Sequence, residues 1–170
     1  MAENKTDNIN LNISTRRKFT IDGDRDKVIF LDVNDLALVN RLSESITKMD
    51  ELKDEWEKLE KLGDTSSEVL EGDEADEALL KEVKDFSEQF TTVENKMRDI
   101  IDYIFDCEGL CQTVVGNSSV FSPVNGTYKF EQIIDVLTGL YEDSIGKEVK
   151  KLNTKKVEKK TSKYIRNAKK

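Results

Sequence analysis

The sequence contains no histidine, and this absence excludes several kinds of site. Histidine is the commonest general base and the commonest metal ligand, so Ser-His-Asp and Cys-His catalysis are ruled out. The patterns G-x-x-x-x-G-K-[ST], G-x-G-x-x-G and G-x-S-x-G are also missing. We therefore expect a protein that is not an enzyme and that uses no cofactor and no metal ion.

Cysteine is scarce as well, since only Cys107 and Cys111 occur. Their spacing of four places both on one face of a helix, which suits a redox pair or half of a metal site. No further cysteine or histidine is available to complete a metal site. We favour the simpler interpretation, in which both are small buried residues near a helix end.

The chain has only one proline and eight glycines, so few residues interrupt regular secondary structure, and this favours long helices over many short strands. Apolar and charged residues each make up 36% of the sequence, so the core should be modest. Residues 1–15 are polar and carry no apolar run of the signal-peptide kind, and no stretch approaches the ~18 apolar residues of a membrane helix. We expect a disordered leader over 1–15 and a cytoplasmic protein without a membrane partner.

A β-hairpin is predicted over residues 17–31. Apolar side chains alternate with polar ones at Phe19 and Ile21, and again at Ile29 and Leu31. Asp22-Gly23 between these runs is a hairpin signal, and we expect a turn of more than two residues. Because a lone hairpin is marginal in water, its apolar face should pack on the first or third long helix.

The first long helix is predicted from Asp35 to about Leu62, with Asn34 as its cap and Gly63 as its stop. Apolar residues follow one another by steps of three or four along one face. This face is Leu36, Val39, Leu42, Ile46, Met49, Leu52, Trp56 and Leu59.

The second long helix should begin near Asp73 or Glu74. Its apolar positions keep the 3.5-residue spacing of a coiled-coil seam for about three heptads, which fits packing on the first helix within one chain or pairing between molecules. The seam is Leu79, Val83, Phe86, Phe90, Val93, Met97, Ile100 and Ile104.

A third helix is predicted from Lys129 to about Lys151, after a turn-rich passage around Pro123. From Lys147 onward the chain carries eleven basic and two acidic residues, a net +9, whereas the rest carries −17. We interpret 151–170 as a mobile or conditionally helical basic tail, which either binds a polyanion or folds back on the acidic body. The fold class is therefore mainly α, with about three long helices, an N-terminal hairpin and a basic tail, and 16–150 form the domain.

Two acidic features each suggest a function, but a purely structural interpretation fits both better. Asp22-Gly23-Asp24 suggests a calcium loop, but the twelfth position counted from Asp22 is Val33 rather than the glutamate of an EF-hand, so a hairpin turn fits better. The acidic run from Glu68 to Glu82 could mimic nucleic acid phosphates, although such a run is more often a solvated helix start and linker.

The order of these elements resembles a family of small proteins from phages and prophages of Gram-positive bacteria, associated with the tail-morphogenesis genes where tail assembly chaperones lie. The strings that carry the resemblance are Arg17 to Asp24, Val28 to Leu36, Val39 to Leu42, the loop with Phe121 and Asn125-Gly126, the helix from Phe130 to Ile145, and Lys163-Tyr164. The resemblance implies a protein without catalytic residues that acts in the host cytoplasm. Such chaperones coat the tape measure protein, keep it soluble and help bring in tail tube subunits.

The function predicted from the sequence is thus a tail assembly chaperone that binds the tape measure and tail tube proteins, with self-association also open. The alternatives are a structural subunit of the virion and a small regulator or inhibitor of a host defence protein. A nucleic acid partner is not expected, because the tail lacks interleaved aromatics. The residues predicted to bind the partner are Phe86, Phe90, Val93, Met97, Lys155, Lys156, Lys159 and Lys160.

Overall fold

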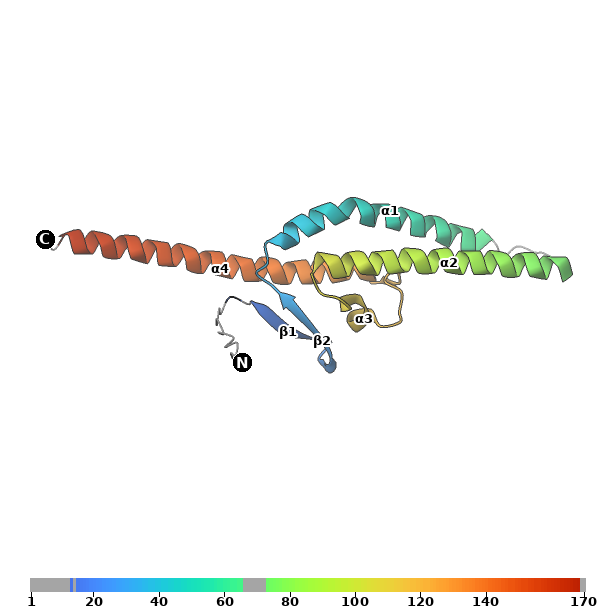
Figure 1. Cartoon of the computed structure of the whole chain (residues 1–170), viewed down its shortest axis with the longest axis horizontal. Coiled ribbons are helices and arrows are strands. Elements are labelled where there is room, and N and C mark those ends of the chain that lie inside the picture. Colours follow the sequence, from blue (N-terminus) through green and yellow to red (C-terminus); the bar gives the residue numbers. More distant parts are fainter. Residues whose placement is uncertain (1–12, 14, 66–72, 169–170) are drawn as a thin grey trace, which may run out of the picture.

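The computed structural model describes residues 13, 15–65 and 73–168, with side chains described through residue 61 and from 80 to 153. The molecule is mainly helical with an N-terminal hairpin, as the sequence predicts, and it is elongated (Figure 1). The elements are β1 (Arg16–Ile21), β2 (Asp24–Asp32), α1 (Ala37–Thr65), α2 (Asp73–Ile104), α3 (Leu110–Val115), β3 (Pro123–Val124), β4 (Thr127–Tyr128) and α4 (Lys129–Ala168).

The β1–β2 hairpin turns more tightly than predicted. Ile21 pairs with Asp24, so Asp22 and Gly23 alone form the turn, with φ of 52° and 75°. Positive φ at both central residues is the requirement of a type I′ turn, which matches the twist of paired strands. The register then shifts, since Thr20 pairs with Val28, and the extra residues of β2 form an irregularity next to the turn.

Helices α1 and α2 pack antiparallel within the chain. Near one end the Arg41 Nε donates to the Ile104 carbonyl oxygen at 2.8 Å, and further along the rings of Trp56 and Phe90 lie 4.4 Å apart between centroids. The predicted seam is thus used inside one molecule. Its outer end is not covered in this way, because Val83 is exposed.

The predicted face of α1 is wrong over its first half. Leu36, Val39 and Ile46 are exposed, whereas Leu38 and Ser45 are buried. The buried residues of α1 follow the spacing of a heptad repeat. Because Ser45 occupies one of these buried positions, the apolar residues alone do not mark the buried face. The buried residues of this face are Leu38, Ser45, Met49, Leu52, Trp56 and Leu59.

The predicted ends of α1 also need correction. The helix begins at Ala37, whose N–H donates to the Asp35 carboxylate at 2.9 Å, and it runs past Gly63 to Thr65. Asn34 therefore does not cap α1 in the predicted way. Its side-chain oxygen instead accepts a hydrogen bond from the Ser144 hydroxyl at 2.7 Å, which ties the start of α1 to α4.

Helix α4 begins at Lys129 as predicted but continues to Ala168 instead of ending near Lys151. Lys53 on α1 pairs with Glu131 at 2.9 Å near the start of α4, and Ser144 is the last buried residue among the α4 side chains that the structure describes. Beyond this point α4 projects from the body by itself (Figure 1). The predicted division of the chain into leader, domain and tail stays a prediction, and residues 1–12 and 14 of the leader lie outside the described residues.

The core lies where α1, α2, α3, α4 and β2 meet. The hairpin contributes Ile29 and Leu31, and β2 contacts α3, a short helix that the sequence did not predict. The largest fully buried side chains are Tyr141, Phe105, Phe121, Leu31, Met97, Ile101, Ile104 and Leu110. None of the helices in the described ranges is long and apolar enough to cross a membrane.

Candidate functional site: an apolar groove between the hairpin and α4

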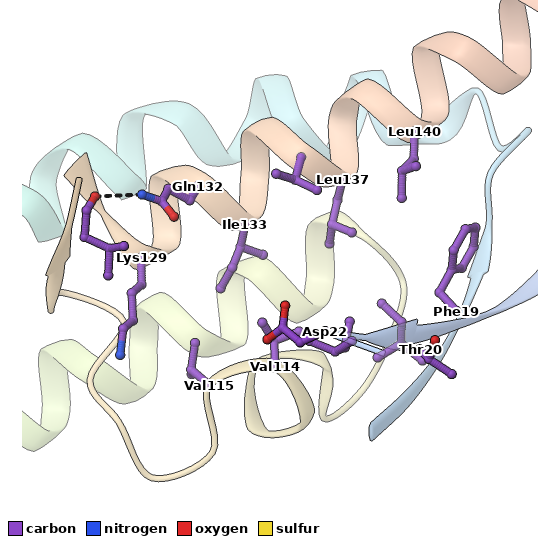
Figure 2. A pocket seen from close by; sticks show the side chains of 14 residues that line it. Phe19, Thr20, Asp22, Val114, Val115, Lys129, Gln132, Ile133, Leu137 and Leu140 are labelled. Atoms are coloured by element: carbon purple, nitrogen blue, oxygen red, sulfur yellow. Dashed lines mark hydrogen bonds between the residues drawn. The ribbon is translucent and has the colours of Figure 1, made fainter. Parts of the chain in front are cut away.

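An open apolar groove of about 420 Å³ separates the β1–β2 hairpin from α4 (Figure 2). One wall comes from the hairpin, the opposite wall from one face of α4, and the remaining side from the end of α3 and from β3. The lining residues are Phe19, Thr20, Ile21, Asp22, Ile29, Val114, Val115, Val124, Lys129, Gln132, Ile133, Val136, Leu137 and Leu140.

The α4 wall follows from helical periodicity. Ile133, Val136, Leu137 and Leu140 are spaced by three and four, so they lie on one face of the helix. Ile133 and Leu137 are buried, while Val136 is 65% exposed. Figure 2 shows Ile133, Leu137 and Leu140 along the wall that faces the hairpin. The groove therefore has an apolar rim that is open to solvent.

Polar groups hold the end of the groove at the start of α4. The Gln132 amide nitrogen donates to the Val124 carbonyl oxygen at 2.7 Å and to the Thr127 hydroxyl at 3.1 Å. The Lys129 ammonium donates to the Ser118 hydroxyl. These contacts fix β3 and the loop before it against the first turn of α4, so the groove is a preformed feature of the fold.

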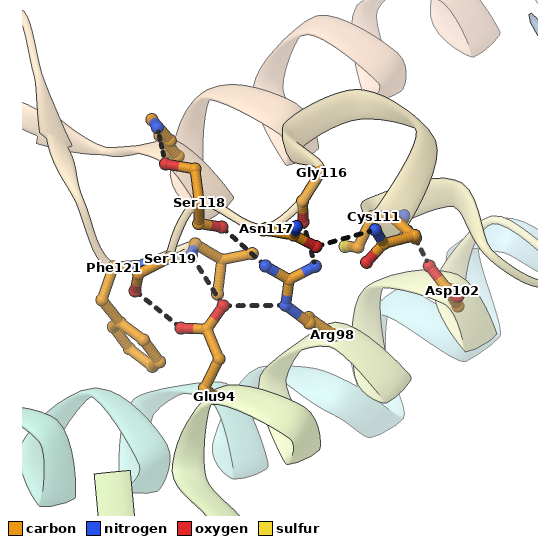
Figure 3. Close-up of polar contacts among 12 residues, drawn as sticks. Glu94, Arg98, Asp102, Cys111, Gly116, Asn117, Ser118, Ser119 and Phe121 are labelled. Atoms are coloured by element: carbon orange, nitrogen blue, oxygen red, sulfur yellow. Dashed lines mark hydrogen bonds and ion pairs between the residues drawn. The ribbon is translucent and has the colours of Figure 1, made fainter. Parts of the chain in front are cut away.

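A buried ion pair positions the loop that borders this region (Figure 3). The carboxylate of Glu94 on α2 accepts hydrogen bonds from Arg98 Nε at 2.8 Å, from the Ser119 hydroxyl at 2.6 Å and from the Val120 N–H at 2.9 Å. Arg98 in turn donates to the carbonyl oxygens of Gly116 and Ser118 at 3.1 and 2.6 Å. Charged groups that are this well partnered specify a single loop conformation.

Asp102 holds the start of α3 in the same manner. Its carboxylate accepts from the Gly109 N–H at 2.7 Å and from the Cys111 N–H at 2.9 Å. Gly109 has a φ of 73°, a conformation that glycine adopts without a steric penalty. The sharp entry into α3 aims Val114 and Val115 at the groove.

The residues predicted from the seam fall into two groups. Val93 and Met97 have no exposed surface and belong to the core, whereas Phe86 and Phe90 are half-buried at the α1–α2 contact. Only these two phenylalanines keep surface that a partner could reach. Their role in binding stays a prediction.

The four predicted lysines, Lys155, Lys156, Lys159 and Lys160, belong to α4, but their side chains lie outside the described residues. The structure does not bring them near the groove, because the groove is lined by the first part of α4. Sequence reasoning missed the groove itself. Val136 could have revealed the groove, because it extends the apolar face of α4 beyond the residues that are buried in the core.

The two cysteines are free thiols, and Cys111 is buried while Cys107 is half-buried. Burial raises the pKa of both thiols, more strongly for Cys111, so both are held in the protonated form. Among the described residues, no three cysteine or acidic side chains are grouped so as to hold a metal ion. The interpretation of both cysteines as small packed residues therefore fits their surroundings.

Comparison of the chain with families of proteins, with curated proteins and with solved structures finds no match.

Proposed function

We propose that this protein is a non-enzymatic tail assembly chaperone of a phage or prophage, which binds the tape measure protein in the host cytoplasm and helps tail tube assembly. The observation that supports the proposal best is the preformed apolar groove between the hairpin and α4. A tape measure protein is a long helical chain with exposed apolar stripes, and its helper must cover those stripes while staying soluble itself.

The groove has the properties of a receptor for an amphipathic helix. Such a helix places apolar anchors at positions i, i+3, i+4 and i+7 into a groove with apolar walls. Here Phe19 on the hairpin lies opposite Leu140 on α4 (Figure 2). Ile21 and Leu137 also line the groove, as does the exposed Val136. The charged groups Asp22 and Lys129 also line the groove and can fix the direction of a bound helix.

The groove accounts for partner binding better than the predicted seam. Val93 and Met97 are fully buried against the chain itself, so a partner could reach them only if α1 and α2 separated. The groove is open in the folded molecule. We therefore assign the main contact with the tape measure protein to the groove.

The test is co-expression of the chain with the tape measure protein from the same genome. The tape measure protein should be soluble and should co-purify with the chain. The variant Val136→Asp places a charge on the apolar rim and should remove both effects. The proposal fails if the tape measure protein stays insoluble with the wild-type chain, or if Val136→Asp protects it as well as the wild type does.

Val39→Asp is the matched control. Val39 is 62% exposed on α1 and does not line the groove, compared with 65% for Val136. Both variants should melt close to the wild type, because surface substitutions rarely change stability by more than about 0.5 kcal/mol.

Mass spectrometry of purified virions separates a chaperone, which should be missing from them, from a structural subunit.

A further inference from the structure

Two projections leave the body of the molecule in opposite directions (Figure 1). One is the arm, which we define as residues 51–65 of α1 and 73–92 of α2. The other is the extension, residues 147–168 of α4, which begins just after Ser144, the last buried residue among the described side chains of that helix. At 1.5 Å per residue, the extension and the α2 side of the arm are each roughly 30 Å long.

The two projections carry opposite charge. The arm contains thirteen acidic and five basic residues, a net −8, and the extension contains nine basic and two acidic residues, a net +7. The two net charges are nearly equal in magnitude and opposite in sign. Because the two lie at opposite ends of the molecule, the extension does not reach the arm of its own chain.

The arm presents a hollow of about 310 Å³ between its two helices, lined by carboxylates. Glu55 comes from α1, and Asp85 and Glu88 come from α2, with Gln89 and Thr92 completing the lining. No basic side chain within the described part of the chain lines this hollow. The nearby Lys84 ammonium lies 4.0 Å from the Glu88 carboxylate, and both side chains are mostly exposed, so this pair neutralises little of the negative potential.

Among the described residues, no element of its own body covers the extension (Figure 1). Val149 and Leu152 on its first turns are exposed, and the Lys151 ammonium contacts Glu148 one turn earlier at 2.6 Å. A helix with this excess of lysine should be attracted to a surface with an excess of carboxylates, and contact would shield its apolar side chains.

We propose that the basic extension of one molecule docks along the acidic arm of a second copy, with its lysines at the hollow formed by Glu55, Asp85 and Glu88. A copy displaced along the long axis of the molecule brings its extension beside the arm of the first. Neither partner then needs to change its fold. This contact between copies uses neither wall of the apolar groove, so it does not depend on the proposed function.

Sedimentation velocity of the full-length chain tests the contact. At low salt the mean mass should rise above the monomer mass as the protein concentration rises. The apparent dissociation constant should increase by roughly tenfold or more between about 0.1 M and about 1 M salt, where the Debye length falls from ~10 Å to ~3 Å.

Two charge-reversal variants make the test specific. The first changes Lys155, Lys156, Lys159 and Lys160 to Glu, and the second changes Glu55, Asp85 and Glu88 to Lys. Each variant should be monomeric alone, because the side chains at positions 155, 156, 159 and 160 then carry the same charge as the three side chains of the hollow that they are proposed to contact. An equal mixture of the two should associate again, because each variant then meets, in the other, side chains of opposite charge at the hollow or at positions 155, 156, 159 and 160.

The matched control changes three exposed carboxylates outside the arm, Asp135, Glu142 and Asp143, to Lys. It alters the net charge as much as the arm variant does, and it should associate like the wild type. The proposal is overturned if the wild type remains monomeric at low salt, if either reversal variant associates like the wild type, or if the mixture stays monomeric. Circular dichroism confirms that each variant keeps its helix content.

Discussion

The indole of Trp56 on α1 stacks on the ring of Phe121, with centroids 4.3 Å apart and planes 5° apart. Phe121 belongs to the passage between α3 and β3, so this contact joins the base of the arm to the loop that borders the groove region. Phe90 of α2 packs on the same indole at 4.4 Å. Since Trp56 is the only tryptophan in the chain, its fluorescence reports on whether this loop is docked.

Glu94→Ala should release the loop and destabilise the protein. The change leaves Arg98, Ser119 and the Val120 N–H without the carboxylate they share, and loss of one partner of a buried ion pair typically costs about 3–5 kcal/mol. We expect a clearly lower free energy of unfolding and a red shift of the Trp56 emission. Both are measured by following fluorescence during urea denaturation.

Glu88→Ala is the control for this experiment, since it removes the same side chain from the same helix. Glu88 is exposed and lies 4.0 Å from Lys84, so its loss should cost less than about 1 kcal/mol and leave the emission unchanged. Equal destabilisation by the two substitutions would show that the Glu94 network does not hold the loop.

The hairpin offers a second test, because neighbouring residues of β2 face opposite sides. Ile29 is buried in the core and Phe30 is exposed. Ile29→Ala should lower the free energy of unfolding by about 2–5 kcal/mol, as expected for an aliphatic core residue. Thermal melting and chemical denaturation measure the effect.

Phe30→Ala should change stability much less, even though it removes the larger side chain. An unchanged melting curve for Ile29→Ala would mean that the hairpin is detached from the body in solution. A large loss for Phe30→Ala would instead show that the exposed face of β2 is covered by something else.

The sequence predicted the elements whose signals are local. The start of α2 at Asp73, the start of α4 at Lys129 and the hairpin each depend on a few neighbouring residues, and all are confirmed. Short elements carry too little periodicity to be recognised, and α3, with its six residues, was missed for that reason. Gly63 did not end α1, because one glycine inside a long helix costs only about 1 kcal/mol.

The groove could not be predicted because its walls come from segments far apart in the chain. Phe19 and Leu140 line the same space, although more than a hundred residues separate them. The position of α3, which the sequence did not reveal, closes its third side. The face of α1 was misassigned for a related reason, since Ser45 is buried by tertiary packing in spite of its polar side chain.

Stability should depend on pH through the pair of Lys53 and Glu131. The hydrogen bond from Lys53 lowers the pKa of the Glu131 carboxyl below its ordinary value of 4.5, and the Tyr128 N–H adds to this effect. A carboxyl whose pKa is depressed in the folded state stabilises the fold above its unfolded pKa, and this contribution is lost as the pH falls through the folded pKa.

Glu131→Gln should therefore be less stable than the wild type at neutral pH, and the difference should shrink as both are brought to about pH 3. The side chains of Lys53 and Glu131 are 36% and 31% exposed, so the difference at neutral pH should not exceed about 1 kcal/mol. Urea denaturation at several pH values measures it. A difference that stays constant across this range would mean that the charge of Glu131 contributes nothing.

The last prediction concerns the extension of α4. Truncation after Leu152 leaves Ser144 in place, which is the last buried residue among the described side chains of α4. The melting temperature should therefore stay nearly unchanged. In dilute solution the extension should be cut by trypsin after Lys155, Lys156 or Lys160, because a helix of this length without tertiary contacts is only marginally stable in water.

Protein concentration adds a sharper test, because the extension is proposed to dock on the arm of a second copy. Trypsin should cut the extension more slowly at concentrations and salt levels where the chain associates, and the truncated chain should sediment as a monomer under all conditions. Rapid cutting at every concentration would contradict docking between copies. An extension that resists trypsin even in dilute monomer, together with a truncated chain that fails to fold, would show instead that residues 153–168 are packed into the domain.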